Sequence, residues 1–175
     1  MEPVSVSFTT RSADATRELG AVLGRLLKPR DFIALLGELG AGKTEFARGV
    51  AEGCGVPPEE VASPTFALIH RYQGRIPLLH ADLFRLAGED DLYGTGYFEL
   101  RDSGEAAALV EWADRIPSAV PADAVRVQFA QGQGHDERRL SAAATGPVSR
   151  TRLAEWANAP GTKVGPTPKT EKGPR

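Results

Sequence analysis

Eight consecutive residues, 37–44, have the types and spacing that bind a phosphate chain. They are Gly-Glu-Leu-Gly-Ala-Gly-Lys-Thr, which matches G-x-x-x-x-G-K-[ST]. Glycines in such a loop let successive backbone N–H groups point toward a polyphosphate, and Lys43 is expected to reach the β- and γ-phosphates. The hydroxyl of Thr44 is expected to ligate Mg²⁺. The motif therefore predicts a nucleotide site, with contacts from Glu38, Leu39, Gly40, Ala41, Gly42, Lys43 and Thr44.

The segments on both sides of this loop have the patterns that the motif requires. Residues 31–36 form a short apolar run between Pro29 and Gly37, which is typical of a buried parallel strand. Residues 44–53 then carry apolar side chains at helical spacing until glycine ends the pattern. Strand, loop and helix in this order favour a phosphate-binding loop over the alternative, a glycine-rich turn with a solvated lysine.

Two carboxylates follow predicted strands elsewhere in the chain. Asp82 follows the apolar run 76–81, and Glu111 follows the run 106–110. Because open α/β sheets bind ligands at the carboxyl ends of their strands, at least one of the two is expected to hold the metal or position water. Either one alone could be an ordinary solvated carboxylate. Thr65, in the segment after the loop helix, is expected either to sense a γ-phosphate or only to cap a turn.

The remaining elements must bring these side chains to one edge of a sheet. The loop motif, together with helical periodicity and strand patterns, predicts an α/β P-loop NTPase fold, with a mainly parallel sheet flanked by helices and an antiparallel edge. The additional strands are expected at residues 4–9, 67–72, 76–81, 106–110, 125–129 and 138–143, and the additional helices at 12–27, near 88–100 and at 149–157.

Composition divides the chain into two parts and limits its function. Residues 1–157 are predicted to form one P-loop ATPase domain, whereas residues 158–175, rich in Pro, Gly and Lys, are predicted to form a disordered basic tail. The formal net charge of −2 argues against a broad basic surface for nucleic acid. Cys54 is the single cysteine, so an internal disulfide is excluded. No run of apolar residues approaches a membrane span, and we expect a cytoplasmic protein without membrane contact.

The class of nucleotide can also be narrowed. Asn158 is the only asparagine, so the Asn-Lys-x-Asp motif with which GTPases read guanine is absent. The remaining classes are an ATPase or a small kinase, with ATP as the favoured nucleotide.

Four motifs in register resemble the TsaE (YjeE) family, small bacterial ATPases of tRNA threonylcarbamoyladenosine synthesis. They are the loop 37–44, Ser-Pro-Thr-Phe at 63–66, His-Ala-Asp-Leu-Phe-Arg-Leu at 80–86 and Val-Glu-Trp at 110–112. Their order and spacing agree with the family from about residue 5 to residue 145. The resemblance implies slow, Mg²⁺-dependent ATP hydrolysis in partnership with the TsaB and TsaD proteins. Contact with tRNA would be indirect, through that complex.

The resemblance also implies roles for individual residues. Thr44 and Glu111 resemble Mg²⁺ ligands, Asp82 the Walker-B-type carboxylate at the metal, and Thr65 the switch residue. Trp112 resembles a residue needed at the partner-facing site. Further nucleotide contacts are expected from Ser12 and from either Arg138 or Arg139.

Two positions depart from the family pattern, and two other functions remain open. Glu45 stands where a second Thr or Ser is usual, which adds a charge beside the nucleotide, and Phe84 stands where Tyr is common. The alternatives are a P-loop kinase of a small metabolite and a nucleotide-dependent binding module whose hydrolysis is incidental. A kinase is expected to carry an arginine-bearing lid, and the sequence has no clear one.

Overall fold

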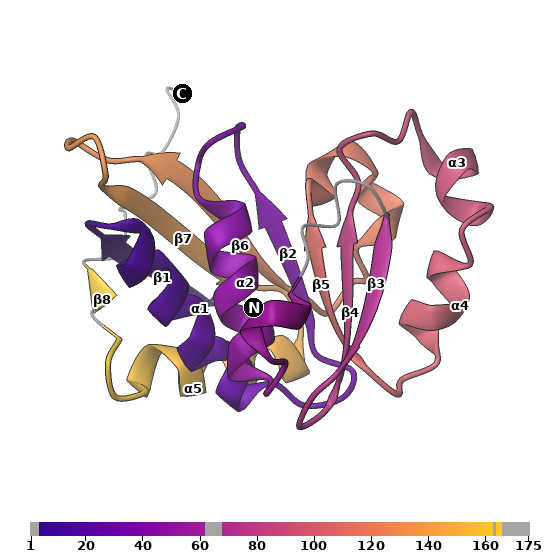
Figure 1. The fold of residues 1–175 in the computed structure, drawn as a ribbon, viewed down its shortest axis with the longest axis horizontal. Helices are drawn as coiled ribbons and strands as arrows, with labels where there is room; N and C mark the ends of the chain where they lie inside the picture. Colours follow the sequence, from indigo (N-terminus) through magenta and orange to yellow (C-terminus); the bar gives the residue numbers. More distant parts are fainter. Residues whose placement is uncertain (1–3, 62–67, 163, 166–175) are drawn as a thin grey trace, which may run out of the picture.

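An eight-stranded mixed sheet forms the centre of the computed structural model, which describes residues 4–61, 68–162, 164 and 165 (Figure 1). The strands are β1 Val4–Thr10, β2 Phe32–Leu36, β3 Ile69–Gln73, β4 Pro77–Asp82, β5 Ala107–Glu111, β6 Val125–Gln131, β7 Arg138–Ala144 and β8 Val164–Gly165. The helices are α1 Ala13–Leu26, α2 Lys43–Gly53, α3 Glu89–Tyr93, α4 Tyr97–Asp102 and α5 Pro147–Asn158, with 3₁₀ turns η1 Pro58–Glu60, η2 Ala113–Arg115 and η3 Pro117–Ala119.

The strand order in the sheet is β3-β4-β5-β2-β6-β7-β1-β8. Strands β4, β5, β2 and β6 run parallel, whereas β3 and the β7–β1–β8 group are antiparallel to their neighbours. The mainly parallel sheet with antiparallel edges confirms the predicted fold class. Because β2 lies in the middle, with β5 and β6 on either side, its carboxyl end is flanked by residues from both neighbours.

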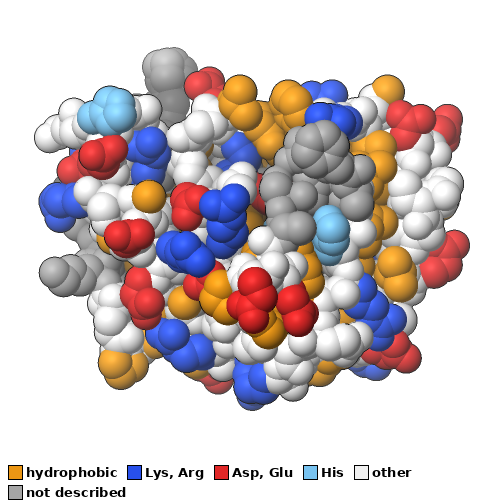
Figure 2. All heavy atoms as spheres, viewed as in Figure 1, with side chains coloured by type: hydrophobic (Ala, Val, Ile, Leu, Met, Phe, Trp, Pro, Cys, Tyr) orange, Lys and Arg blue, Asp and Glu red, His pale blue; other side chains and the backbone are white. Residues whose placement is uncertain are grey.

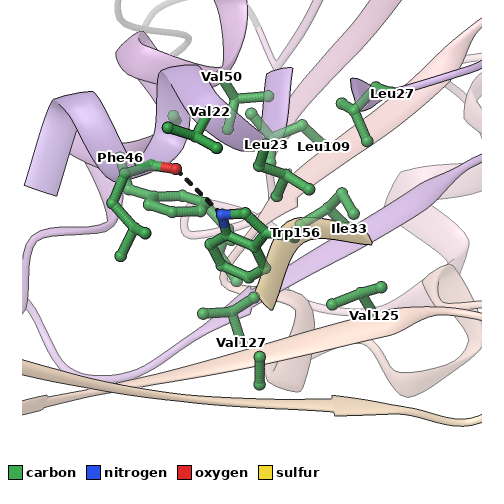
Figure 3. Packing of buried hydrophobic residues seen from close by; sticks show 14 of the residues in the cluster. Val22, Leu23, Leu27, Ile33, Phe46, Val50, Leu109, Val125, Val127 and Trp156 are labelled. Atoms are coloured by element: carbon green, nitrogen blue, oxygen red, sulfur yellow. Dashed lines mark hydrogen bonds between the residues drawn. The ribbon is translucent and has the colours of Figure 1, made fainter. Parts of the chain in front are cut away.

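Side chains of β2 alternate between two apolar layers. Ile33 and Leu35 pack into the layer under α1, α2 and α5, while Phe32 and Ala34 face the opposite layer near α3, α4, η2 and η3. A strand buried on both faces has a continuous apolar sequence rather than an alternating one, which is why the run 31–36 was recognisable. Figure 3 shows the first layer around Ile33.

Helix α5 is anchored in that layer by Trp156. Its ring lies 4.3 Å from the ring of Phe8 and 5.7 Å from that of Phe46, and its indole N–H donates to the Leu19 carbonyl at 3.3 Å (Figure 3). A buried tryptophan requires such a partner for its single donor. The C-terminal helix is thereby fixed against β1, α1 and α2.

Helices α1 and α2 pack with unusually close backbones. A Cβ atom on Gly49 would lie 1.9 Å from the carbonyl oxygen of Arg17, so only glycine fits at this position of α2. The close contact fixes α2, and with it the loop that precedes α2, against α1. The predicted start of α1 is confirmed, since the Ser12 hydroxyl accepts the Ala15 N–H at 3.0 Å.

Two segments add detail to the sequence-based expectations. The stretch 88–100, expected to contain one short helix and a loop, forms the two short helices α3 and α4. Val164 and Gly165, within the segment predicted to be a tail, pair with Phe8 and Ser7 of the otherwise open edge strand β1. The domain boundary at residue 157 stays a prediction, and residues 163 and 166–175 lie outside the described residues.

Charged side chains are interspersed on the face drawn in Figure 2. Lys and Arg lie beside Asp and Glu over α1 and α2 rather than in a single basic patch. Ion pairs such as Arg17–Glu52 and Arg48–Glu45 bring opposite charges together there. In the described part of the chain, no helix has both the length and the apolar character needed to cross a bilayer.

Candidate nucleotide-binding site

The glycine loop leaves the carboxyl end of β2 and leads directly into α2. Gly42 is the residue before the helix and has φ +103°, a left-handed conformation that favours glycine. This turn leads directly into α2, a helix of eleven residues whose N-terminus has no side-chain cap. Backbone N–H groups at such a helix start, together with the helix dipole, form a site for an anion.

Lys43 is a buried cation in this loop. The residue is 4 % exposed, and its ammonium donates to the carbonyls of Gly37 and Glu38, the latter at 2.7 Å. It also lies 3.9 Å from the centroid of the Trp112 ring. Among the described residues, no carboxylate forms an ion pair with Lys43. Burial lowers the pKa of Lys43, and the more distant charge of Glu111 opposes this shift. A buried ammonium without a paired anion suits a phosphate ligand.

Thr44 and Glu111 meet where α2 begins and β5 ends. The Thr44 hydroxyl donates to Oε1 of Glu111 at 3.2 Å, while Oε2 of Glu111 is 2.8 Å from Nε2 of His80. Glu111 is 1 % exposed, so β5 delivers a buried carboxylate next to the loop. Mg²⁺ prefers oxygen ligands and in nucleotide sites takes one or two from the protein and others from phosphates. The two side chains fit that donor set.

Asp82 lies on the neighbouring strand β4, paired in register with Glu111. Its Oδ1 accepts the backbone N–H of Phe84 at 2.9 Å. Desolvation raises the pKa of Asp82, and the Phe84 N–H opposes the shift. The structure thus brings both predicted carboxylates to one edge of the sheet. Asp82 is nevertheless not among the residues that line the cavity beside the glycine loop.

A hollow of about 280 Å³ opens beside the loop. Ser12, at the start of α1, and Arg138, at the start of β7, lie on its wall. One Arg138 nitrogen donates to the His135 carbonyl at 2.8 Å, and another approaches the Gly40 carbonyl at 3.4 Å. The neighbouring Arg139 pairs with Glu137 instead and does not line the hollow. The lining residues are Ser12, Ala13, Thr16, Leu39, Gly40, Ala41, Gly42, Lys43, Thr44, Glu45, Trp112, Asp136 and Arg138.

Trp112 adopts a backbone conformation that is rare for a bulky side chain. Its φ of +57° lies in the left-handed region, directly after β5 and before η2. The ring contacts Lys43 and lies 4.8 Å from the ring of Phe84, which is 42 % exposed. Trp112 therefore joins the lysine of the loop to an aromatic side chain at the surface. A non-glycine residue keeps such a conformation only where its surroundings hold it, and here the ring packs against Lys43 and Phe84.

The structure adds residues that the sequence-based prediction did not include. His80 contacts Glu111, and Asp136 and Thr16 line the hollow. His80 could have been found because it lies two residues before Asp82, and alternate residues of a strand share a face. Glu38 faces a separate hollow rather than this one, although its carbonyl binds Lys43. Thr65 lies outside the described residues.

A sheet with a parallel centre, whose middle strand leads through a glycine loop into a helix, together with a buried lysine and a Thr–Glu pair, defines the class of P-loop nucleotide-binding proteins. A family model described as "Threonylcarbamoyl adenosine biosynthesis protein TsaE" matches residues 10–140. The chain belongs to the TsaE family.

Three relatives agree with this assignment. A protein of Treponema pallidum named tRNA threonylcarbamoyladenosine biosynthesis protein TsaE is 41 % identical over 120 residues, covering 69 % of this chain and 87 % of the relative. The protein of the same name from Bacillus subtilis is 36 % identical over 143 residues, covering 81 % and 87 %. The crystal structure of Bacillus subtilis YdiB superposes with a TM-score of 0.72 at 28 % identity, over 90 % of this chain and 97 % of that one.

Proposed function

We propose that this protein binds ATP with Mg²⁺ and hydrolyses it slowly as a component of the machinery that forms N6-threonylcarbamoyladenosine in tRNA. It acts with a TsaB–TsaD complex in the cytoplasm and meets tRNA only through that complex. The relatives carry names from this biosynthesis, and the family membership extends their role to this chain. The partners and the slow turnover follow from the family resemblance.

The observation that supports nucleotide binding best is the buried ammonium of Lys43. Its hydrogen bonds go to two carbonyls of its own loop, and no described carboxylate is paired with it. A β- or γ-phosphate would supply the missing negative charge. The N-terminus of α2 and the loop N–H groups would bind the same phosphates.

The carboxylates and hydroxyl beside the loop suit the metal and the hydrolysis step. Thr44 and Glu111 would hold Mg²⁺, and Asp82 would contribute a second carboxylate at the same edge or orient the attacking water. A metal held by these residues would supply positive charge to offset the negative charge of the phosphates. Ser12 and Arg138 would contact the parts of the nucleotide that extend into the hollow.

One comparison of ATP turnover tests this function against its competitors. We would measure phosphate release by the protein alone, with small metabolites, and with the TsaB–TsaD pair and tRNA. Formation of the modified nucleoside should require the protein and fall when Glu111→Ala replaces it. Phosphate appearing on a metabolite would instead establish a kinase, and full tRNA modification with Glu111→Ala would indicate a binding module.

Asp82→Asn separates hydrolysis from binding. The metal and the attacking water matter most in the transition state, so turnover should fall while ATP affinity stays near that of the wild type. If Asp82→Asn instead lowers only ATP affinity and leaves turnover unchanged, the proposed role of Asp82 is wrong. Lys43→Ala should show the opposite pattern, because removal of its charge should weaken ATP binding itself.

A further inference from the structure

The environment of Glu111 contains one side chain to which neither the family resemblance nor the proposed function gives a role. His80 of β4 is 2 % exposed and contacts Oε2 of Glu111 at 2.8 Å. The other oxygen of the same carboxylate accepts from Thr44 at 3.2 Å. Each oxygen of Glu111 is therefore held by a different element, one by α2 and one by β4.

The hydrogen bonds assign the proton on His80. An ionised carboxylate only accepts hydrogen bonds, so Nε2 must donate to Glu111. In the neutral ring Nδ1 is then the unprotonated nitrogen. This assignment agrees with the surroundings, since Nδ1 is buried without a hydrogen-bond partner among the described residues. His80 consequently acts as a directed donor with one available target.

Packing holds this donor in place. His80 pairs in register with Leu109 of the parallel strand β5, two residues before Glu111. On the other side its ring lies 6.3 Å from the ring of Tyr72 on β3. Both strands are hydrogen-bonded to β4, so the backbone from which the imidazole projects is fixed in the sheet.

We propose that His80 is a positioning residue that orients the Glu111 carboxylate for Mg²⁺. This proposal rests on the proposed function, because it assumes that Glu111 and Thr44 hold the metal. Without the bond from Nε2, the carboxylate can rotate about its terminal torsion, which has a broad energy profile. Groups that orient metal ligands in this way typically change metal affinity ten- to a hundredfold when removed.

The test measures metal binding apart from turnover. Mn²⁺ is titrated into the protein–ADP complex and free Mn²⁺ is followed by electron paramagnetic resonance, while ADP affinity is measured separately in EDTA. His80→Leu should weaken Mn²⁺ binding about ten- to a hundredfold and leave ADP affinity in EDTA unchanged. His80→Gln, whose amide N–H can replace the donor, should recover most of the affinity.

His70→Leu is the matched control. His70 pairs with His80 across β3 and β4 and stacks on Tyr72 with ring centroids 5.6 Å apart, but it forms no hydrogen bond or ion pair with Glu111 among the described contacts. Its Mn²⁺ affinity should equal that of the wild type.

Four results would overturn the proposal. They are wild-type Mn²⁺ affinity in His80→Leu, equal losses in His80→Leu and His80→Gln, an equal loss in His70→Leu, and a parallel loss of ADP affinity in EDTA. The last two would assign His80 a purely structural role. If the wild-type protein itself shows no Mn²⁺-dependent ADP binding, the proposed function fails and this inference fails with it. The wild-type titration thus distinguishes the two failures.

Discussion

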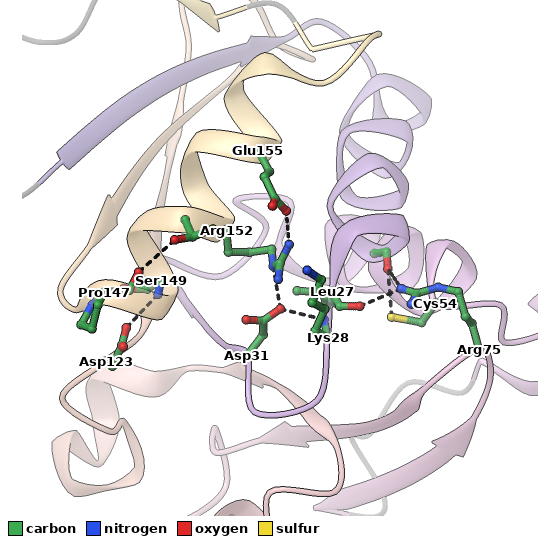
Figure 4. A network of polar contacts seen from close by, with 12 residues as sticks. Leu27, Lys28, Asp31, Cys54, Arg75, Asp123, Pro147, Ser149, Arg152 and Glu155 are labelled. Atoms are coloured by element: carbon green, nitrogen blue, oxygen red, sulfur yellow. Dashed lines mark hydrogen bonds and ion pairs between the residues drawn. The ribbon is translucent and has the colours of Figure 1, made fainter.

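The two ends of strand β2 both carry buried charges, but the charges are bonded differently. At the carboxyl end Lys43 is 4 % exposed and binds two carbonyls of its own loop. Before the amino end of β2, Asp31 is 4 % exposed and Arg152 of α5 is 3 % exposed, and the two form an ion pair at 2.6 Å (Figure 4). Burial alone therefore does not distinguish a structural charge from a functional one.

What distinguishes the ends is whether each charge has its partner within the protein. Arg152 also pairs with Glu155, and the Lys28 N–H donates to Asp31 at 2.7 Å, so the charges of the amino end are compensated. A hollow of about 350 Å³ lies there too, but its buried ions are already bound to each other. At the loop end the ammonium lacks an anion, and an external phosphate would complete the arrangement. The difference predicts opposite responses to mutation at the two ends.

The largest effect is expected from Arg152→Met. This change leaves the Asp31 carboxylate buried without its cation, and breaking a buried pair in this way costs about 3–5 kcal/mol of unfolding free energy. Urea denaturation followed by circular dichroism measures the loss. Arg25→Met removes an exposed pair with Glu18 and is the control, with an expected change below about 1 kcal/mol. Similar losses in the two variants would mean that the Asp31–Arg152 pair does not stabilise the amino end.

Nucleotide should stabilise the protein by binding at the carboxyl end of β2, without any contribution from the amino end. At a hundred times its dissociation constant, Mg²⁺–ADP should raise the free energy of unfolding by about 2.7 kcal/mol. The ends of β2 are about 16 Å apart for five residues, so the increment should be the same in Arg152→Met. A clearly smaller increment in that variant, measured by denaturation with and without ligand, would show that the two ends are coupled.

Local features of the loop end could be predicted from the sequence, whereas pairings over long distances could not. The motif identified Lys43 and Thr44, and apolar runs ending in Asp82 and Glu111 placed both carboxylates at one sheet edge, as the β4–β5 register has them. Asp31 and Arg152 are 121 residues apart, and no local pattern links them. The choice between Arg138 and Arg139 depended on which face of β7 turns toward the loop, and only the strand register determines that.

A smaller effect is expected from Ser12→Ala, because Ser12 both stabilises a helix and lies in the candidate nucleotide site. Its hydroxyl caps α1, and the residue lines the hollow beside the loop. Loss of the cap should lower the free energy of unfolding by about 1 kcal/mol. ADP affinity should fall as well if the hydroxyl contacts nucleotide. Ser12→Asp restores a capping oxygen but adds a negative charge, so it should recover stability without recovering affinity. Recovery of both by Ser12→Asp would show that only the cap matters.

The smallest change in stability is expected from Lys43→Met, although the side chain is buried as deeply as that of Arg152. Methionine keeps the aliphatic contact with Trp112 and removes a desolvated charge that has no paired anion. The carbonyls of Gly37 and Glu38 that lose the ammonium belong to a partly exposed and an exposed residue, so water can bind them instead. The free energy of unfolding without ligand should therefore stay within about 1 kcal/mol of the wild type, since loss of charged hydrogen bonds is offset by relief of desolvation. Stabilisation by Mg²⁺–ADP should largely disappear. A loss of about 3–5 kcal/mol without ligand, as at Arg152, would mean that Lys43 is compensated inside the protein and that the contrast between the two ends is wrong.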